Sequence, residues 1–283
     1  MPLRFQQHPG LVVYLTAGDR GLSPRYRIEE RRPGSGADLS LTRDIALAAI
    51  DAGADVIELG VPFSDPLGDG PVIQRASERA VANGTRLKDV IALAAELRAA
   101  RPQAGLVIFS YLNPILRFGL AKFADAAAEA GADGVLLIDM IVEEAAEYIA
   151  EMERVNLAPI FLAAPTSPDE RLAAIAAHSK GFIYAISRTG ITGQQQSVAA
   201  DAAALVTRIR RWSKLPVAVG FGISNADHVA EVAKFADAAV IGSAIVELIE
   251  RSTEEQAPSA VARFIQGLFT KGLRQQHEVA QAL

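Results

Sequence analysis

Carboxylates cluster in one short stretch of the chain, which runs from Glu58 through Asp65 to Asp69. Glu58 alternates with the apolar residues Ile57 and Leu59, so its side chain should point to one side of an otherwise buried strand. A carboxylate in such a place is costly unless it is paired or functional. Burial raises the pKa of a carboxyl group and prepares it to exchange protons near neutral pH. Glu58 is therefore a candidate general acid and base, with a structural ion pair as the alternative.

Asp65 and Asp69 follow this strand in a segment that is rich in proline and glycine. Such residues fix the backbone of a loop, which would then present the two acids at the end of the strand. Each aspartate can equally be a turn residue whose side chain bonds its own backbone, and the residues alone leave both interpretations open. The proline and glycine residues are Pro62, Pro66, Gly68, Gly70 and Pro71.

Three glycine clusters predict a site for an anion such as phosphate. They are Gly190–Gly193, Gly220–Ser224 and Gly242–Ile245, each after a predicted strand. Glycine lets backbone N–H groups approach an anion closely, and a helix that begins at Gly242 or Ser243 adds a favourable dipole. Any one of these glycines alone is an ordinary turn residue. The last two clusters contain no lysine or arginine, which fits binding by neutral amides.

Large apolar side chains also occur near the ends of predicted strands. Core packing explains most residues of this kind. Beside a carboxylate and a phosphate site, however, they would suit a flat aromatic substrate. They are Tyr14, Phe109, Leu136, Leu162, Tyr184 and Phe221.

The elements that must position these residues are eight short apolar runs, each followed by an amphipathic stretch. Strands that are almost continuously apolar are buried on both faces and need crossover helices. Eight such units without a linker predict a single (β/α)8 TIM barrel, with one domain over residues 1–283 and its chemistry at the carboxyl ends of the strands. The strands are expected at 11–16, 56–59, 106–110, 134–137, 158–162, 181–186, 217–221 and 238–241, and the helices at 41–52, 87–100, 120–130, 142–155, 170–178, 199–212, 226–234 and 261–283.

Residues 20–38 interrupt this alternation of predicted strands and helices. The segment follows the first strand, has no clear period, and combines a charge-dense part at 25–32 with a flexible part at 33–36. Most loops between a strand and a helix are about 2–6 residues long. We therefore expect a flexible, charged insertion in the first βα loop. It acts as a lid or partner contact, or it has no function.

Composition narrows the functional classes. The formal net charge of −5 offers no basic field for nucleic acid, and the chain has no cysteine. Four scattered histidines lack metal-ligand spacing, so no metal site is expected. The N-terminus has no signal-like apolar run and no stretch is long enough to span a membrane. We expect a cytoplasmic protein that acts on a small molecule.

The motifs together resemble those of the tryptophan synthase α family. The run Ile57–Gln74 closely resembles the family's signature, and further segments fall in the family's order over nearly the whole chain. These are Leu15–Asp19, Tyr111–Pro114, Ala158–Phe161, Thr189–Gly193, Gly220–Ser224 and Gly242–Val246.

The resemblance implies retro-aldol cleavage of indole-3-glycerol phosphate to indole and glyceraldehyde 3-phosphate. Glu58 would be the principal acid and base, Asp69 would hold the indole nitrogen, and Asp65 would lie in the loop that faces a β subunit. The implied assembly is an αββα heterotetramer that makes L-tryptophan, with no cofactor in this subunit and pyridoxal phosphate in the β partner. Implied substrate contacts come from Tyr14, Phe109, Leu136, Tyr184, Thr192 and Phe221, and implied phosphate contacts from Gly193, Gly222, Gly242 and Ser243.

Three segments depart from the family's pattern. Asp139–Glu144 replaces a more proline-rich loop that helps to meet the β subunit. The part before Leu11 is short, which leaves little for the helix that commonly plugs the barrel floor. The 20–38 segment is longer than the family norm. The alternatives are another phosphate-binding barrel, of sugar-phosphate or histidine metabolism, and a silent barrel that only activates a β-type partner; Glu58 with the 64–70 loop argues against the first, and the presence of both acids against the second.

Overall fold

The strands of the chain form one sheet in which every pairing is parallel. The computed structural model describes residues 3, 5–22, 37–186, 195–220 and 222–281. Within these residues the sheet has nine strands, in the order β5-β4-β3-β2-β1-β9-β8-β7-β6. They are β1 (Gly10–Thr16), β2 (Val56–Gly60), β3 (Gly105–Ser110), β4 (Gly134–Leu137), β5 (Ala158–Ile160), β6 (Leu162–Ala163), β7 (Ile183–Ile186), β8 (Val217–Gly220) and β9 (Ala238–Ile241).

The two ends of this sheet are consecutive in the chain, because only Phe161 separates β5 from β6. β5 pairs with β4, whereas β6 pairs with β7. One segment therefore joins both edges and closes the sheet into a barrel, which confirms the predicted (β/α)8 fold. The strand predicted at 158–162 is two strands, since its pairing changes from one neighbour to the other at Phe161.

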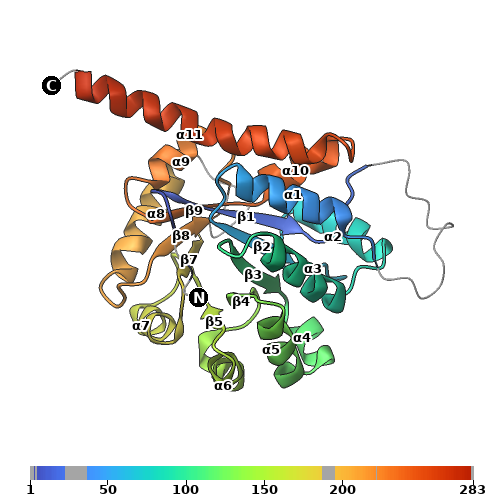
Figure 1. The fold of residues 1–283 in the computed structure, drawn as a ribbon. Helices are drawn as coiled ribbons and strands as arrows, with labels where there is room; N and C mark the ends of the chain where they lie inside the picture. Colours follow the sequence, from blue (N-terminus) through green and yellow to red (C-terminus); the bar gives the residue numbers. More distant parts are fainter. Residues whose placement is uncertain (1–2, 4, 23–36, 187–194, 221, 282–283) are drawn as a thin grey trace.

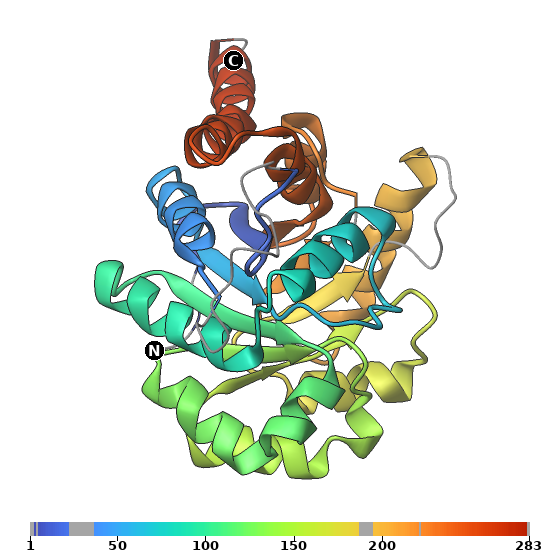
Figure 2. The ribbon, with the colours of Figure 1, turned by 90° about the vertical axis from the view of Figure 1, so that its right-hand side faces the viewer.

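The helices surround the strands (Figures 1 and 2). None of the helices that the structure describes is long and apolar enough to cross a membrane. α2 and α4 were not predicted, and α8 begins earlier than expected. The helices are α1 (Ser40–Asp51), α2 (Pro71–Ala82), α3 (Leu87–Ala100), α4 (Leu112–Phe118), α5 (Leu120–Glu129), the 3-10 helix η2 (Val142–Glu144), α6 (Ala146–Arg154), α7 (Asp169–His178), α8 (Gln195–Ile209), α9 (Ala226–Val232), α10 (Ser243–Arg251) and α11 (Ala257–Gln281).

Alternate residues of each strand face opposite sides of the barrel wall. Val12 and Tyr14 belong to the cluster inside the barrel, whereas Val13 and Leu15 pack in the shell between strands and helices. Tyr14 lies opposite Glu58 in the parallel register of β1 and β2. Since Glu58 has the same parity as the interior residue Val56, its side chain belongs to the inside of the barrel.

The floor of the barrel is filled by side chains of the short N-terminal segment. Leu3 is buried in the interior cluster, and the ring centroids of Phe5 and Phe182 lie 5.9 Å apart. A Cβ on Gly10 would lie 2.4 Å from the Phe5 ring, so glycine makes room for it there. Two side chains thus fill this end of the barrel.

Candidate active site

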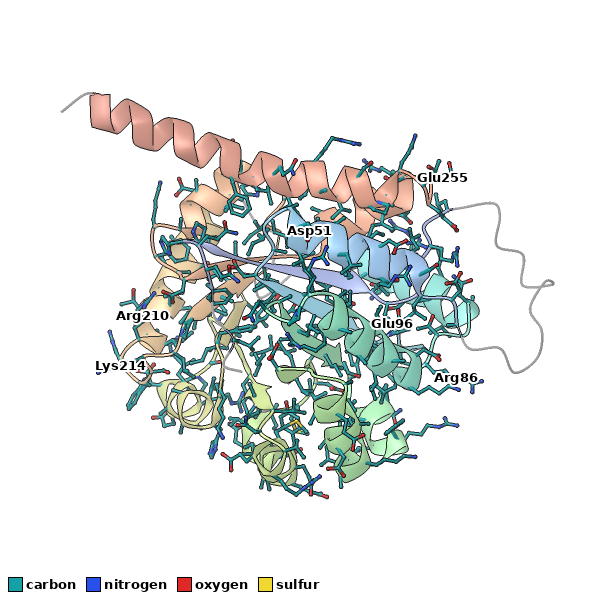
Figure 3. All side chains as sticks on the ribbon, in the orientation of Figure 1. Asp51, Arg86, Glu96, Arg210, Lys214 and Glu255 are labelled. Carbon is teal, nitrogen blue, oxygen red and sulfur yellow. The ribbon has the colours of Figure 1, made fainter. Side chains whose placement is uncertain are left out.

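A cavity of about 440 Å³ opens at the carboxyl ends of the strands. Most of its wall comes from β1, β2, β3, β7 and β9 and from the turns that follow these and the neighbouring strands. Charged side chains such as Asp51, Glu96 and Arg210, which are labelled in Figure 3, are instead exposed to solvent and are not part of this wall. The sequence-predicted residues that line the cavity are Tyr14, Glu58, Asp69, Phe109, Leu162, Tyr184, Gly222, Gly242 and Ser243.

The other predicted residues lie elsewhere or outside the described part of the chain. Leu136 is fully buried opposite Phe109 in the interior cluster, and it is not part of the cavity wall. Asp65 is exposed on the loop after β2, where its carboxylate accepts a 2.5 Å hydrogen bond from the Ser64 hydroxyl. Thr192, Gly193 and Phe221, and residues 23–36 of the predicted insertion, lie outside the described residues.

Glu58 is completely buried at the bottom of the cavity. Its side chain is 0% exposed, and neither carboxyl oxygen has a hydrogen-bond partner among the described residues. Burial raises the pKa of Glu58 from 4.5 to about 8, because nothing around it replaces the water that would stabilise a carboxylate. At neutral pH the group therefore holds a proton that it can donate.

Two tyrosines flank Glu58, and both depend on glycine for space. A Cβ on Gly60 would lie 2.3 Å from the Tyr14 hydroxyl, and one on Gly220 would lie 2.2 Å from the Tyr184 hydroxyl. Burial first, and then nearby carboxylates, raise the pKa of both phenols, so they stay neutral. The Tyr14 ring meets Phe109 edge to face at 5.1 Å between centroids, which gives this part of the cavity an aromatic wall.

Asp69 has a polar environment in which Tyr111 is the main partner. The Tyr111 hydroxyl donates a 3.0 Å hydrogen bond to Oδ2 of Asp69 and accepts one of 2.9 Å from the Gly68 N–H. The pKa of Asp69 is raised to about 6 by burial, and the hydrogen bond from Tyr111 opposes the rise. Asp69 is therefore mostly ionised at pH 7, whereas Glu58 is protonated. Two carboxyl groups with separated pKa values can take different roles in one reaction.

The far end of the cavity is built from backbone. Gly222 has a φ of 78°, and the space where its Cβ would point is open. Gly242 precedes α10, and Ser243 and Ala244 of its first turn line the cavity. N–H groups of a first helical turn lack partners within the helix and favour anions. No lysine or arginine is among the described lining residues, so an anion here would be held by amides and hydroxyls.

Sequence reasoning missed several residues of this site. Tyr111 was noted only as part of a motif, although an aromatic residue directly after a strand was a usable signal. Other lining residues were not singled out: some lie in elements that the pattern did not mark, and some lie in predicted strands or glycine clusters of which only other members were named. They are Ile73, Ile138, Ile186, Ile223, Ser224, Val240, Ala244 and Glu247. In the described part of the chain, no group of three or more histidine, aspartate or glutamate residues is arranged to hold a metal ion.

Comparison with known proteins gives one consistent family. The family described as "Tryptophan synthase alpha chain" matches residues 3–272. The tryptophan synthase alpha chain of Solibacter usitatus is 45% identical over 255 residues, which are 90% of this chain and 89% of the relative. That of Cupriavidus metallidurans is 43% identical over 263 residues, 93% of each chain.

Solved structures agree with this result. Tryptophan synthase subunit alpha from Legionella pneumophila has a TM-score of 0.79 at 33% identity, with 92% of this chain and 91% of that chain covered. A chain of the tryptophan synthase complex from Pyrococcus furiosus has a TM-score of 0.78 at 33% identity, with 93% and 98% covered.

Proposed function

The chain belongs to the tryptophan synthase alpha chain family, and from this membership we propose that Glu58 and Asp69 carry the family's reaction in the cavity described above. The chain is an α subunit, a lyase of tryptophan biosynthesis that cleaves indole-3-glycerol phosphate to indole and glyceraldehyde 3-phosphate. The observation that carries the proposed roles is the difference in protonation between two acids that line one cavity.

Glu58 acts as acid and then as base. Its proton moves to C3 of the indole ring, which becomes an electron-poor indolenine. The resulting carboxylate takes the proton of the adjacent glyceryl hydroxyl, the carbon–carbon bond breaks, and its electron pair returns to the ring as indole forms. Glu58 ends protonated, as it began, so the proton count balances. A raised pKa near the working pH suits a group that must both donate and accept.

Asp69 stabilises the charge that this step creates. Protonation of C3 spreads positive character to the ring nitrogen, so an anionic carboxylate at the ring N–H binds the transition state more tightly than the ground state. The hydrogen bond from Tyr111 favours the ionised form of Asp69 and orients it. Because the indole ring accepts the electrons, the step needs no cofactor in this subunit.

The two ends of the cavity match the two ends of the substrate. Tyr14, Phe109 and Tyr184 form the wall for the indole ring, and Gly222, Gly242 and Ser243 bind the phosphate through backbone N–H and hydroxyl groups. Leu136 supports this wall from the barrel interior. Phe221, Thr192 and Gly193 remain predicted contacts of the same substrate.

The chain works with a β subunit in an αββα heterotetramer. A neighbouring structure from Pyrococcus furiosus is of a tryptophan synthase complex, and Asp65 and Leu67 are exposed on the loop that leads to Asp69. The β subunit would receive indole and hold the pyridoxal phosphate. We place the protein in the cytoplasm, which suits a biosynthetic enzyme without cysteine. Residues 1–283 would act as one domain, with 20–38 as an insertion in its first βα loop.

Indole release tests this function. The purified chain is incubated with indole-3-glycerol phosphate, alone and with a tryptophan synthase β subunit, and indole is measured. We expect slow release by the chain alone and much faster release with β. Absence of indole in both conditions would refute the enzymatic role, and stimulation of β by a chain that releases none would identify a partner that only activates.

A further inference from the structure

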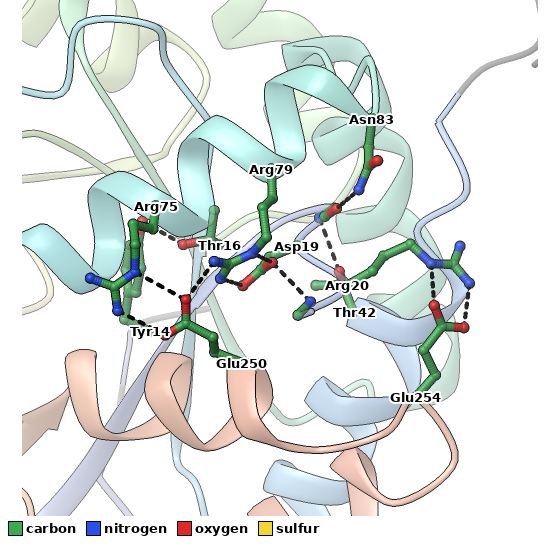
Figure 4. A network of polar contacts seen from close by, with 12 residues as sticks. Tyr14, Thr16, Asp19, Arg20, Thr42, Arg75, Arg79, Asn83, Glu250 and Glu254 are labelled. Carbon is green, nitrogen blue, oxygen red and sulfur yellow. Dashed lines mark hydrogen bonds and ion pairs between the residues drawn. The ribbon is translucent and has the colours of Figure 1, made fainter. Parts of the chain in front are cut away.

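A network of ion pairs connects α2, α10 and the turn after β1 (Figure 4). Arg79 of α2 donates two hydrogen bonds to Asp19, which follows β1, from Nε at 2.7 Å and from Nη2 at 2.9 Å. Its Nη1 donates to Glu250 of α10 at 2.7 Å. Arg75, one turn earlier on α2, donates to the same carboxylate from Nε at 3.0 Å and from Nη2 at 2.8 Å. Glu250 therefore accepts hydrogen bonds from two arginines of one helix.

Much of this network is shielded from solvent. The exposed fractions of the side chains are 2% for Asp19, 11% for Glu250 and 18% for Arg79, whereas Arg75 is 48% exposed. Hydrogen bonds from Arg75 and Arg79 lower the pKa of Glu250 to about 2, so it is ionised at every pH near neutrality. Shielded charges are costly to leave unpaired. The network consequently tolerates only a small range of positions of α2 relative to α10.

Both helices joined in this way begin at the cavity. Gly70, the residue before α2, directly follows Asp69, and the Gln74 side chain on the first turn of α2 donates a 2.9 Å hydrogen bond to the Asp69 carbonyl oxygen. The first turn of α10 contributes Ser243 to the anion end. The ion pairs thus connect α2 and α10 beyond their first turns. The N-terminal ends of the same two helices form opposite ends of the cavity.

We propose that Arg75, Arg79 and Glu250 are positioning residues, which fix the distance between Asp69 and the phosphate-binding turn of α10. This inference rests on the proposed function. A substrate that joins an indole ring to a phosphate must engage both ends at once, and a misplacement of about 1 Å can cost roughly 100-fold in rate. Separate ring and phosphate molecules make no such demand, because each adjusts to its own end.

Glu250→Gln tests the proposal, since it removes the charge and keeps the shape. For this variant and the unchanged chain, kcat/KM for indole-3-glycerol phosphate is measured per folded molecule, with the folded fraction taken from urea unfolding. Dissociation constants are measured separately for indole and for glycerol 3-phosphate. We expect kcat/KM to fall about 10-fold or more, while each fragment's dissociation constant stays within about twofold. A role limited to overall stability would not lower kcat/KM per folded molecule while the dissociation constants of the two fragments stay the same.

Two further variants keep the test decisive. Arg75 is half-exposed, so Arg75→Gln should fold even if Glu250→Gln does not, and it should show a smaller split in the same direction. Arg98→Gln is the control: Arg98 binds Asp133 at 2.6 Å and the Gly131 carbonyl at 2.9 Å, at the opposite end of the barrel from the cavity. It should lower stability and leave kcat/KM per folded molecule unchanged.

Two results would overturn the inference. One is wild-type kcat/KM in both network variants. The other is a loss of fragment affinity by the same factor as kcat/KM, which would mean that each end is damaged by itself. Absence of indole release from the unchanged chain would refute the proposed function instead, so the two failures are distinguishable.

Discussion

Glu58→Gln should make the protein more stable while it abolishes cleavage. The pKa of Glu58 rises from 4.5 to about 8 on folding, so the folded state binds its proton more tightly than the unfolded chain does. Stability is therefore lost as pH rises from about 4.5 to about 8. At about 1.4 kcal/mol per pKa unit, the cost is roughly 1 kcal/mol at pH 5.5, roughly 3 kcal/mol at pH 7 and roughly 5 kcal/mol at pH 8.5. Glutamine does not titrate, so the variant should regain these amounts.

Urea unfolding of both proteins at pH 5.5, 7 and 8.5 measures this gain. Because neither carboxyl oxygen of Glu58 has a described partner, the substitution breaks no hydrogen bond of the described structure that would offset it. Cleavage should fall by a factor of about 1,000 or more, since the amide cannot transfer protons. Glu129→Gln, an exposed change on α5, is the matched control and should alter stability by less than about 0.5 kcal/mol. Destabilisation of the variant at pH 7, or a gain in stability that does not grow with pH, would refute the conclusion that Glu58 is a buried carboxyl group without a partner.

Three further substitutions test other parts of the site. Tyr111→Phe removes the hydrogen bond that lowers the pKa of Asp69, so this pKa should rise above about 6 and activity should fall more at pH 6 than at pH 8; an unshifted pH–rate profile would contradict this role. Gly222→Ala places a methyl group at a φ of 78° and toward the cavity, and it should weaken inhibition by glycerol 3-phosphate about 10-fold; unchanged inhibition would remove Gly222 from the phosphate site. Gly60→Ala puts a Cβ 2.3 Å from the Tyr14 hydroxyl and should cost about 1–3 kcal/mol in urea unfolding, whereas the double variant with Tyr14→Leu should be more stable than the sum of the single changes; simple additivity would speak against the contact.

The barrel was predictable because its strands are buried on both faces. The apolar composition of runs such as Val56–Gly60 indicates that the strands are buried on both faces. The alternation of residues around Glu58 places its side chain inside the barrel. The change of pairing at Phe161 was not predictable, since nothing local distinguishes two short strands from one. α2 was missed because its buried face consists of Ala76, Ser77 and Ala80, which are too small and polar to give a strong apolar period.

A site residue was predictable where its position in one strand determines its role. It was less predictable where its role depends on contacts with residues far away in the sequence. The prediction of Glu58 needed only its place in the alternation of strand residues. The ionisation of Asp69, in contrast, depends on a hydrogen bond from Tyr111, 42 positions along the chain. Glu250 lies 175 and 171 positions from Arg75 and Arg79, so in the sequence these charges look like an ordinary solvated surface. The roles predicted for residues 20–38 and for Thr192 stay predictions.

The loop between β2 and α2 explains why a partner could control this reaction. Its two ends are held, one by strand β2 and the other by the ion pairs of α2 with α10, but Leu67 in its middle is 92% exposed. Asp69 lies between that exposed point and the anchored helix, so we expect a partner that covers Leu67 to act on the carboxylate of Asp69 rather than on Glu58, which is buried within the barrel. If the β subunit of the proposed assembly covers this loop, we expect it to accelerate the step assigned to Asp69 without contact to Glu58.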